Sequence, residues 1–298
     1  MHGVVNLDKP VGPTSHDMVG LLRRLTSIRR IGHAGTLDPL ASGVLPILVG
    51  AATRFSAELT GGDKRYDATI RLGARSATDD AEGPIEPVDA PLPDESAVRG
   101  ALAGMTGTML QRPPDFSARK LGGRVAHRAA RAGEALELAP RAVTIHALEV
   151  RSVDRGERWL DVVVDVRCGS GTYVRSIARD LGERLATGGY LRALRRTEAA
   201  GLSVEAAVTP ERLADLDADG RLEEAIMPVG PLLTLPRVVL GEAAAWRFLH
   251  GSAQPLEAGD AGDARVAVFE GDRLLGIGAV AGGVLSPEKV VPAETLVS

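Results

Sequence analysis

The spacing of hydrophobic and polar positions predicts amphipathic helices in several parts of the chain. Apolar residues recur at helical spacing in residues 14–25, where Ser15 is a suitable N-cap. The same pattern returns in residues 96–106. A further helix is predicted from about Tyr173, with an apolar stripe formed by Val174, Ile177, Ala178, Leu181 and Leu185.

Strands are predicted where the pattern alternates or becomes rich in valine. Residues 66–72 alternate as a half-buried strand does, with one apolar face made of Tyr66, Ala68, Ile70 and Leu72. Valine dominates residues 159–167, which favours a second strand. Residues 264–280 predict a hairpin that turns at residues 270–272.

The order of these elements favours an α+β fold, because strands and helices interleave without the regular alternation of a doubly wound sheet. From about Leu235 the chain changes to short strands punctuated by glycine. We therefore predict one domain over residues 1–235 and a small β domain over residues 236–298. Residues 76–95 are acidic and contain several prolines, so a mobile surface loop is expected there.

Composition narrows the class of protein. The chain has 298 residues, of which 44% are hydrophobic, enough for a sizeable core. The sequence contains no run of about 20 apolar residues, so we predict no membrane span. The first residues lack a signal-peptide pattern. The single cysteine, Cys168, allows no internal disulfide and fits the reducing cytoplasm. The six histidines lack ligand spacing, so we expect no metal site.

Charge is distributed unevenly. The formal net charge of −4 by itself argues against a polyanionic partner. Residues 111–131, however, carry six bases against Asp115, and residues 167–196 carry seven arginines against two acids. Residues 76–97 carry seven acids and no base. Basic stretches can contact phosphates whatever the total charge, although for either stretch alone a solvated helix face is the simpler explanation.

Asp38 is the first candidate for chemistry. It lies directly before a proline, where an acid commonly does no more than bond to nearby N–H groups in a turn. Here, however, Gly35 and Gly43 permit close approach of a ligand, and the apolar residues 44–49 would hold the loop rigid and remove water from its rim. A desolvated carboxylate needs a cationic partner to remain charged.

Arg175 is a candidate for that partner. It falls in the first turn of the predicted helix, where the helix dipole disfavours a cation. An anion facing the side chain would explain this position, and a side chain pointing to solvent is the alternative. Tyr66 offers a stacking surface for a nucleobase, or else it is a core aromatic with a hydrated hydroxyl.

Other polar residues give weaker indications. His33 can stack or form hydrogen bonds, or it can merely shape its turn. Cys168 has no base near it in the sequence, which favours a buried small side chain over a nucleophile. Residues 169–172, Gly-Ser-Gly-Thr, precede a helix and can cradle a phosphate, but they lack the spacing of known phosphate loops.

Taken together these segments resemble one family. The loop "GHAGTLDPLASGVLP" closely resembles the signature loop of the TruB family of bacterial tRNA pseudouridine synthases. The resemblance continues in the same order through "NLDKPVGPTSHD", "KRYDATIRLG", "QRPPDFSARKLGGR", "GSGTYVRSIARDLG" and "YLRALRRTEAAG", which cover most of residues 1–201. The tail, with "LSPEKVV", resembles a short form of the family's RNA-binding PUA module.

The resemblance implies a fold and an activity. The fold would be a mixed, mostly antiparallel sheet flanked by helices, followed by a PUA-like domain. The activity would be isomerisation of uridine 55 in the T loop of tRNA to pseudouridine, without cofactor or metal. The partner would be the T stem-loop of tRNA. Nothing in the sequence indicates an obligate oligomer, so a monomer is expected.

Site residues are carried over position by position. Asp38 matches the family's catalytic aspartate, Tyr66 the tyrosine that packs on the target base, and Arg175 the arginine that pairs with the aspartate. Residues that match the lining of the base and ribose pocket are His33, Tyr66, Tyr173 and Leu194. The residues expected to contact RNA elsewhere are Lys64, Arg65, Arg119, Lys120 and Arg124.

The sequence departs from the family at two positions and leaves alternatives open. Phe116 and His127 stand where tyrosine is usual, which affects RNA contacts rather than the chemistry. Whether Asp38 attacks the sugar carbon as a nucleophile, attacks the ring or removes a ribose proton is open. Other readings of the chain are a non-catalytic tRNA-folding chaperone, a relative that works with a guide RNA, and a hydrolase built on Cys168.

Overall fold

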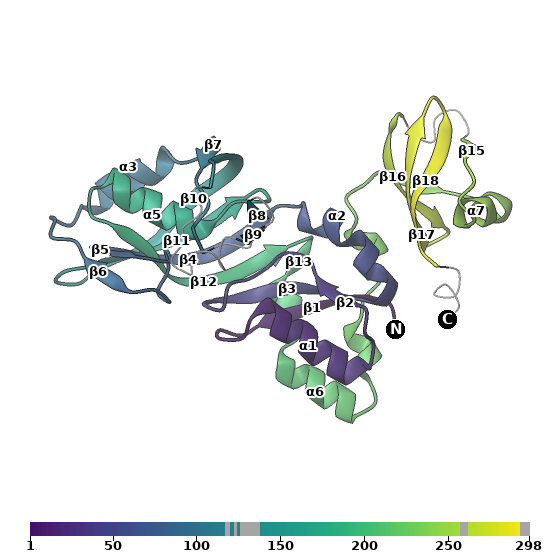
Figure 1. Cartoon of the computed structure of the whole chain (residues 1–298), viewed down its shortest axis with the longest axis horizontal. Coiled ribbons are helices and arrows are strands. Elements are labelled where there is room, and N and C mark those ends of the chain that lie inside the picture. Colours follow the sequence, from purple (N-terminus) through teal and green to yellow (C-terminus); the bar gives the residue numbers. More distant parts are fainter. Residues whose placement is uncertain (117–119, 122–123, 126–137, 257–261, 293–298) are drawn as a thin grey trace.

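A large mixed sheet forms the centre of the structure (Figure 1). The computed structural model describes residues 1–116, 138–256 and 262–292, together with the backbone of residues 120–121 and 124–125. Within these residues the sheet has nine strands, in the order β1-β3-β12-β4-β11-β10-β7, with β2 beside β3 and β13 beside β12. The pairs are antiparallel except β12 with β3, which is parallel. The strands are β1 (Gly3–Lys9), β2 (Ile31–His33), β3 (Ala41–Val49), β4 (Lys64–Leu72), β7 (Gly107–Gln111), β10 (Arg141–Arg155), β11 (Leu160–Cys168), β12 (Gly189–Ala199) and β13 (Leu202–Ser203).

Alternation along the strands decides what each face of the sheet carries. On β4 the even-numbered residues from Tyr66 to Leu72 are buried in the main hydrophobic core, as the sequence pattern predicts. Arg65 and Arg71 lie on the other face, where they form ion pairs at 2.7 Å with Asp165 and Asp161 of β11. One face of this half of the sheet is therefore apolar, and the other is covered by paired charges.

Helices cover the apolar face at both ends of the sheet (Figure 1). They are α1 (Ser15–Thr26), α3 (Glu95–Ala103), α5 (Val174–Arg184) and α6 (Pro210–Ala218). The expected N-cap of the first helix is wrong by one residue. Thr14 is the N-cap and forms a capping box with Asp17, because Ser15 uses its hydroxyl to bind the backbone of Leu37.

The acidic stretch after β4 is more ordered than expected. A short hairpin forms here, in which β5 (Ala74–Ser76) pairs with β6 (Ile85–Pro87). Asp80, between these strands, is only 2% exposed. The expectation of a mobile surface loop is therefore wrong for this part, because its acids face arginines of α5. Most of the basic stretch at residues 111–131 lies outside the described residues.

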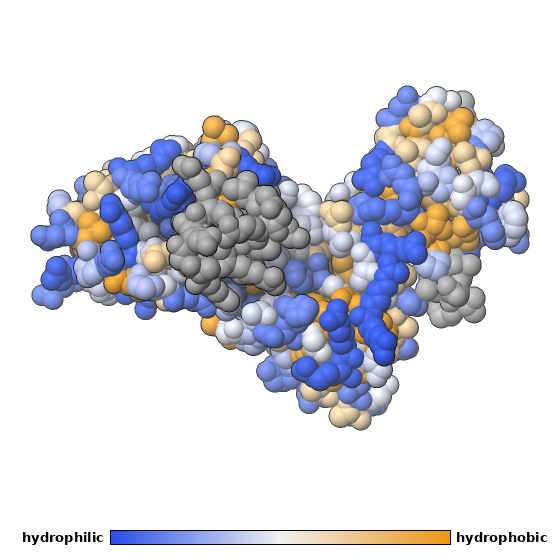
Figure 2. Space-filling view, viewed as in Figure 1, coloured by the Kyte–Doolittle hydropathy of each residue, from blue (hydrophilic) through white to orange (hydrophobic). Residues whose placement is uncertain are grey.

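The C-terminal part forms a separate five-stranded sheet within the described residues. Its strands are β14 (Arg237–Val239), β15 (Gln254–Pro255), β16 (Ala264–Glu270), β17 (Arg273–Ala281) and β18 (Val284–Val290), with α7 (Glu242–Leu249) packed beside them. β16 and β17 form the predicted hairpin. Figure 2 shows an open notch between this part and the main body.

Ion pairs and apolar contacts join the two parts. Glu58 of α2 (Ser56–Thr60) is 8% exposed at its side chain and binds Arg265 at 3.0 Å and Lys289 at 2.7 Å. Apolar side chains of the preceding 3₁₀ turn, residues 50–55, share a core cluster with Ile277 and Val291. No helix in the described part of the chain is long and apolar enough to cross a membrane.

Candidate active site

Asp38 lies in the loop between β2 and β3, and two buried side chains fix this loop from outside. The Ser15 hydroxyl accepts a hydrogen bond from the Leu37 N–H at 2.8 Å and donates to the Leu37 carbonyl at 3.0 Å. Arg196 of β12 donates to the carbonyls of Gly35 at 3.1 Å and Val44 at 2.7 Å. The backbone on both sides of Asp38 is therefore held to α1 and to the central sheet.

Gly43 is required where this loop enters the sheet. Its φ of +102° is in the left-handed region, and a Cβ there would lie 2.1 Å from the Arg196 carbonyl oxygen. The close approach lets β3 pair in parallel with β12 at this point. Gly43 is therefore needed for close packing of two backbone segments, whereas the sequence suggested that it permits close approach of a ligand.

Arg175 faces Asp38, although 136 intervening positions separate the two residues in the sequence. Its Nε lies 2.9 Å from Asp38 Oδ2, and its side chain is 6% exposed. The same guanidinium donates to the carbonyls of Thr78 at 3.3 Å and Phe116 at 3.0 Å. These contacts account for a cation in the first turn of α5, where the helix dipole disfavours one.

A second carboxylate shares this arginine. Asp80 Oδ2 lies 3.5 Å from Arg175 Nη1, and the Asp80 side chain is 3% exposed. The Thr78 hydroxyl and the Glu82 N–H both donate to Asp80 Oδ1. Sequence reasoning missed Asp80, although an acidic run without bases, together with an arginine-rich run elsewhere, was a signal that the two meet.

The pKa of Asp38 is raised above its ordinary value. Burial among the walls of the site is the main cause, and the charge of Asp80 adds to it. Arg175 and Lys9 oppose this rise in the pKa of Asp38. The side chain remains 36% exposed, so the carboxylate is open to a ligand while its surroundings are poor in water.

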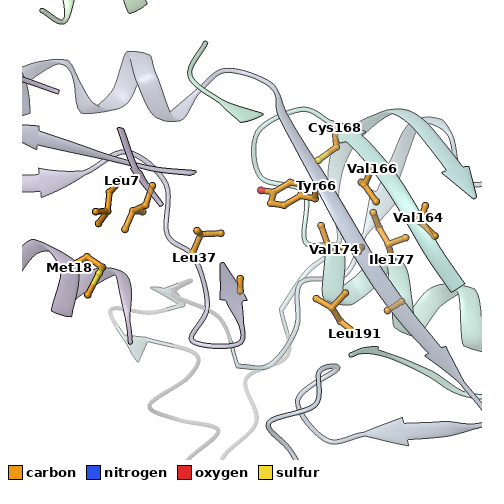
Figure 3. Close-up of a cluster of buried hydrophobic side chains, with 14 of the residues drawn as sticks. Leu7, Met18, Leu37, Tyr66, Val164, Val166, Cys168, Val174, Ile177 and Leu191 are labelled. Atoms are coloured by element: carbon orange, nitrogen blue, oxygen red, sulfur yellow. The ribbon is translucent and has the colours of Figure 1, made fainter. Parts of the chain in front are cut away.

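A pocket of about 270 Å³ opens on one side of Asp38. Tyr66, Tyr173 and Leu194 line it, together with Lys64, Arg175 and Arg196. In Figure 3 the Tyr66 ring extends from β4 toward the loop that carries Leu37. Burial raises the pKa of the Tyr66 hydroxyl, which is therefore neutral near pH 7. The structure thus brings Asp38, Arg175, Tyr66, Tyr173 and Leu194 together around one cavity.

His33 lies on the other side of Asp38. It lines a second hollow of about 720 Å³ with His16, Asp80 and Phe116, and it does not line the pocket with Tyr66. Its Nδ1 is buried and has no hydrogen-bond partner within the described part of the chain. Burial, followed by the charge of Arg196, lowers the pKa of His33, which favours the neutral ring.

The residues expected to contact RNA occupy different settings. Lys64 lies at the pocket edge and donates to the carbonyls of Thr60 and Gly62. Arg65 lies on the opposite face of β4 and is ion-paired with Asp165 and Glu198. Arg119 lies outside the described residues. Lys120 and Arg124 have described backbones, in the paired strands β8 (Lys120–Leu121) and β9 (Arg124–Val125), while their side chains lie outside that description.

Cys168 and the residues after it do not form a nucleophilic site. Cys168 is 1% exposed, and burial raises the pKa of its thiol to about 11. Gly171 and Thr172 line the Asp38 pocket, so the glycine-rich turn forms part of the pocket wall. Among the described residues, no group of three or more His, Cys, Asp or Glu side chains is placed to hold a metal ion.

Comparison with known proteins identifies the class. Family models described as "TruB family pseudouridylate synthase (N terminal domain)", "tRNA pseudouridylate synthase B C-terminal domain" and "Pseudouridine synthase II TruB, C-terminal" match residues 23–174, 175–234 and 236–291. Proteins named tRNA pseudouridine synthase B are similar over 98% of this chain. One from Burkholderia lata is 46% identical over 90% of its own length, and one from Ralstonia nicotianae is 43% identical over 94%.

Solved structures share the fold. A chain in a Cbf5-Nop10-Gar1 complex has a TM-score of 0.75 and 29% identity, covering 98% of this chain and 86% of its own. A chain in an H/ACA RNP bound to a substrate RNA containing 2′-deoxyuridine has a TM-score of 0.74 and 26% identity, covering 99% and 87%. The fold is that of a pseudouridine synthase. Within this class, the chain belongs to the TruB family.

Proposed function

We propose that this chain is a tRNA pseudouridine synthase that isomerises uridine 55 in the T loop of tRNA. The observation that carries the proposal is the Asp38–Arg175 pair, 2.9 Å apart, at the wall of a pocket of about 270 Å³ that Tyr66 also lines. Such a pocket offers one base an aromatic face and offers the adjoining sugar a carboxylate. The relatives named tRNA pseudouridine synthase B support tRNA as the substrate.

The chemistry exchanges one bond to the sugar for another. The bond from ribose C1′ to uracil N1 breaks, the ring turns, and C1′ bonds to C5. The hydrogen on C5 leaves as a proton, and N1 takes up a proton, so the product is an isomer of the substrate. No oxidant, reductant or second substrate enters the balance. The target base must first leave its stack, which costs a few kcal/mol.

We assign the following roles to the residues of the site. Asp38 acts as the nucleophile in its ionised form, and Arg175 holds that carboxylate charged and aimed. Tyr66 stacks on the base, while Tyr173 and Leu194 close the walls of the pocket. Because the detached uracil must stay in place until it rejoins the sugar, the enclosed site acts as an entropy trap.

RNA would be held outside this pocket. Lys64 marks the edge where the RNA backbone enters. Basic residues of 111–131 and those of 167–196 other than the buried Arg175 and Arg196 supply phosphate contacts that weaken with salt. Residues 1–235 would form the catalytic domain and residues 236–298 a PUA-like RNA-binding domain. The enzyme would work as a monomer in the cytoplasm on the T stem-loop, without guide RNA.

Release of tritium tests the proposal. Wild-type protein should release tritium from bare tRNA labelled at uridine C5, and from a T-arm hairpin that contains uridine 55. The Asp38→Asn variant should release none and should bind the same tRNA within about threefold of wild type, because removing the charge leaves the outer RNA contacts intact. Tight binding without release by wild type would favour the chaperone, and release only with a guide RNA would favour the guided relative. Full activity of Asp38→Asn would overturn the assignment of Asp38.

A further inference from the structure

One buried glutamine outside the site described above binds the backbone of a pocket residue at two points. Gln111, the last residue of β7, is 2% exposed. Its Nε2 donates to the Tyr173 carbonyl at 3.1 Å, and its Oε1 accepts from the Tyr173 N–H at 2.8 Å. The side-chain amide therefore takes the place of a neighbouring strand for this single residue.

Tyr173 needs such support, since its own surroundings in the chain give little. It is the N-cap of α5, and its side chain makes no capping hydrogen bond. The residues before it, 169–172, include Gly169 and Gly171, and Gly171 has a φ of +83°. Glycines leave a turn conformationally free unless other contacts fix it. The Tyr173 carbonyl also accepts from the Ile177 N–H of α5 at 3.2 Å. Among the described residues, Gln111 is the side chain whose hydrogen bonds fix the Tyr173 backbone.

The residues after Gln111 continue the same attachment. The Arg112 carbonyl accepts from the Ser176 hydroxyl at 2.8 Å and from Arg179 Nη2 at 2.9 Å. The Phe116 carbonyl accepts from Arg175 Nη2 at 3.0 Å. Residues 111–116 thus bind the first two turns of α5 at successive positions. Among these contacts, only Gln111 binds through its side chain, so only that contact can be removed by a substitution at residues 111–116 without altering the backbone.

We propose that Gln111 is a positioning residue for the isomerisation, and this rests on the proposed function. By fixing Tyr173 it sets where α5 begins, and so sets Arg175, two residues later, against Asp38. The separation that depends on this is the 2.9 Å between Arg175 Nε and Asp38 Oδ2. Displacements of about 1 Å in a catalytic arrangement can cost about a hundredfold in rate. The loss should therefore appear in the chemical step rather than in RNA affinity.

Gln111→Met tests this, because methionine has a similar length and shape but cannot make either hydrogen bond. The matched control is Gln254→Met. Gln254 is also buried, at 3% exposed, and donates to a backbone carbonyl, that of Ala244 at 3.0 Å, but it lies in the C-terminal sheet. The single-turnover rate of tritium release at saturating tRNA, the tRNA dissociation constant and the melting temperature are measured for both variants and for wild type.

The proposal expects Gln111→Met to be slower by about 10- to 100-fold in single turnover, with tRNA affinity within about threefold of wild type. Gln254→Met should keep the wild-type rate at a comparable melting temperature. An unchanged rate in Gln111→Met overturns the proposal. An equal loss in both variants also overturns it, because general destabilisation then explains the effect.

Gln111→Glu adds a readout that a merely structural role would not move. An ionised glutamate accepts from the Tyr173 N–H but cannot donate to the Tyr173 carbonyl, whereas a protonated one does both. Arg112 follows it in the chain and Arg141 lies opposite it on β10, both exposed to solvent. From α5, Arg175 and Arg179 bind the backbone of residues 112–116. The rate of Gln111→Glu relative to wild type should rise as the pH falls from 8 to 6, and a ratio independent of pH contradicts the hydrogen-bonding role.

If wild type releases no tritium, the proposed function fails on that result alone. The positioning role is then decided by a crystal structure of Gln111→Met, in which an unmoved Tyr173 backbone overturns it.

Discussion

Replacing Arg175 with methionine isolates the electrostatic part of the site. Methionine keeps much of the apolar stem of the side chain and removes the guanidinium. Arg175 is 6% exposed, and its Nε lies 2.9 Å from Asp38 Oδ2. Removing one group that stabilises charge in a catalytic site typically raises the activation barrier by about 2.7–4 kcal/mol. Asp38 is 36% exposed, so water screens part of the interaction and the lower end of that range applies. About 3 kcal/mol corresponds to roughly a hundredfold in rate.

The assay is single-turnover tritium release at saturating tRNA, with the dissociation constant of tRNA measured separately. Arg179→Met is the matched control. Arg179 lies one turn further along α5, is 11% exposed, and pairs with Asp79 at 2.8 Å and Asp180 at 2.9 Å. Within the described part of the chain it pairs with these two acids and not with Asp38, so its loss should lower stability without a comparable loss of rate. Arg175→Met should bind tRNA almost as well as wild type, because a buried guanidinium has little contact with the RNA surface.

Two results would refute this reasoning. The first is a single-turnover rate for Arg175→Met within threefold of wild type, which would remove the guanidinium from the chemistry. The second is an equal loss of rate in Arg179→Met, which would show that any damage to α5 suffices. A fall in tRNA affinity that accounts for the whole effect would move Arg175 from catalysis to binding.

Three further predictions follow from the charges and burial of single groups. The single-turnover rate should fall as the pH drops, because the proposed role of Asp38 requires its ionised form. Since the pKa of Asp38 is raised, this fall in rate should begin at a higher pH than it would for an ordinary aspartate. A rate independent of pH down to pH 4 contradicts this. Burial raises the pKa of Glu58, but hydrogen bonds from Lys289 and Arg265 outweigh it and leave that pKa lowered. The stabilisation from Glu58 is present above the ordinary glutamate pKa and is lost as the pH falls through the lowered one. In denaturant titrations at pH 7, the free energy of unfolding of Glu58→Gln should therefore be about 1–2 kcal/mol lower than that of wild type, and this difference should shrink as the pH falls through the lowered pKa of Glu58. Cys168→Ser should keep the wild-type rate of tritium release within about threefold, and a complete loss would reopen the hydrolase reading.

Much of the fold could be predicted because its signals are local. The alternation in β4, the apolar stripe of α5 and the hairpin of β16 and β17 each depend on residues close in the sequence. The pairing of Asp38 with an arginine could also be anticipated. A carboxylate in an apolar loop and a cation at a helix N-terminus each lack a local partner, and each supplies what the other needs.

The residues that were missed act through tertiary contacts. Arg196 looked like one of several arginines in a basic run, yet it is 1% exposed and binds the backbone on both sides of the Asp38 loop. Asp80 stood in a stretch rich in acids and prolines, where composition indicates a loop and says nothing of burial. Thr14 and Ser15 are equally good caps, and only the position of Leu37 decides between them. No periodicity reports such long-range choices.

The position of Asp80 also bears on how strongly Arg175 holds Asp38. A carboxylate paired with a guanidinium of its own has a low pKa and is a poor nucleophile, whereas burial would raise the pKa of an unpaired one in this site further and favour its protonated form. Arg175 lies 2.9 Å from Asp38 and 3.5 Å from Asp80, so one cation serves two acids. The pair with Asp38 is thereby weakened without being lost, and the pKa of Asp38 stays above its ordinary value. Because Ser15, Arg196 and Gln111 fix the backbones that carry the acid and the arginine, this balance is set by geometry before RNA binds.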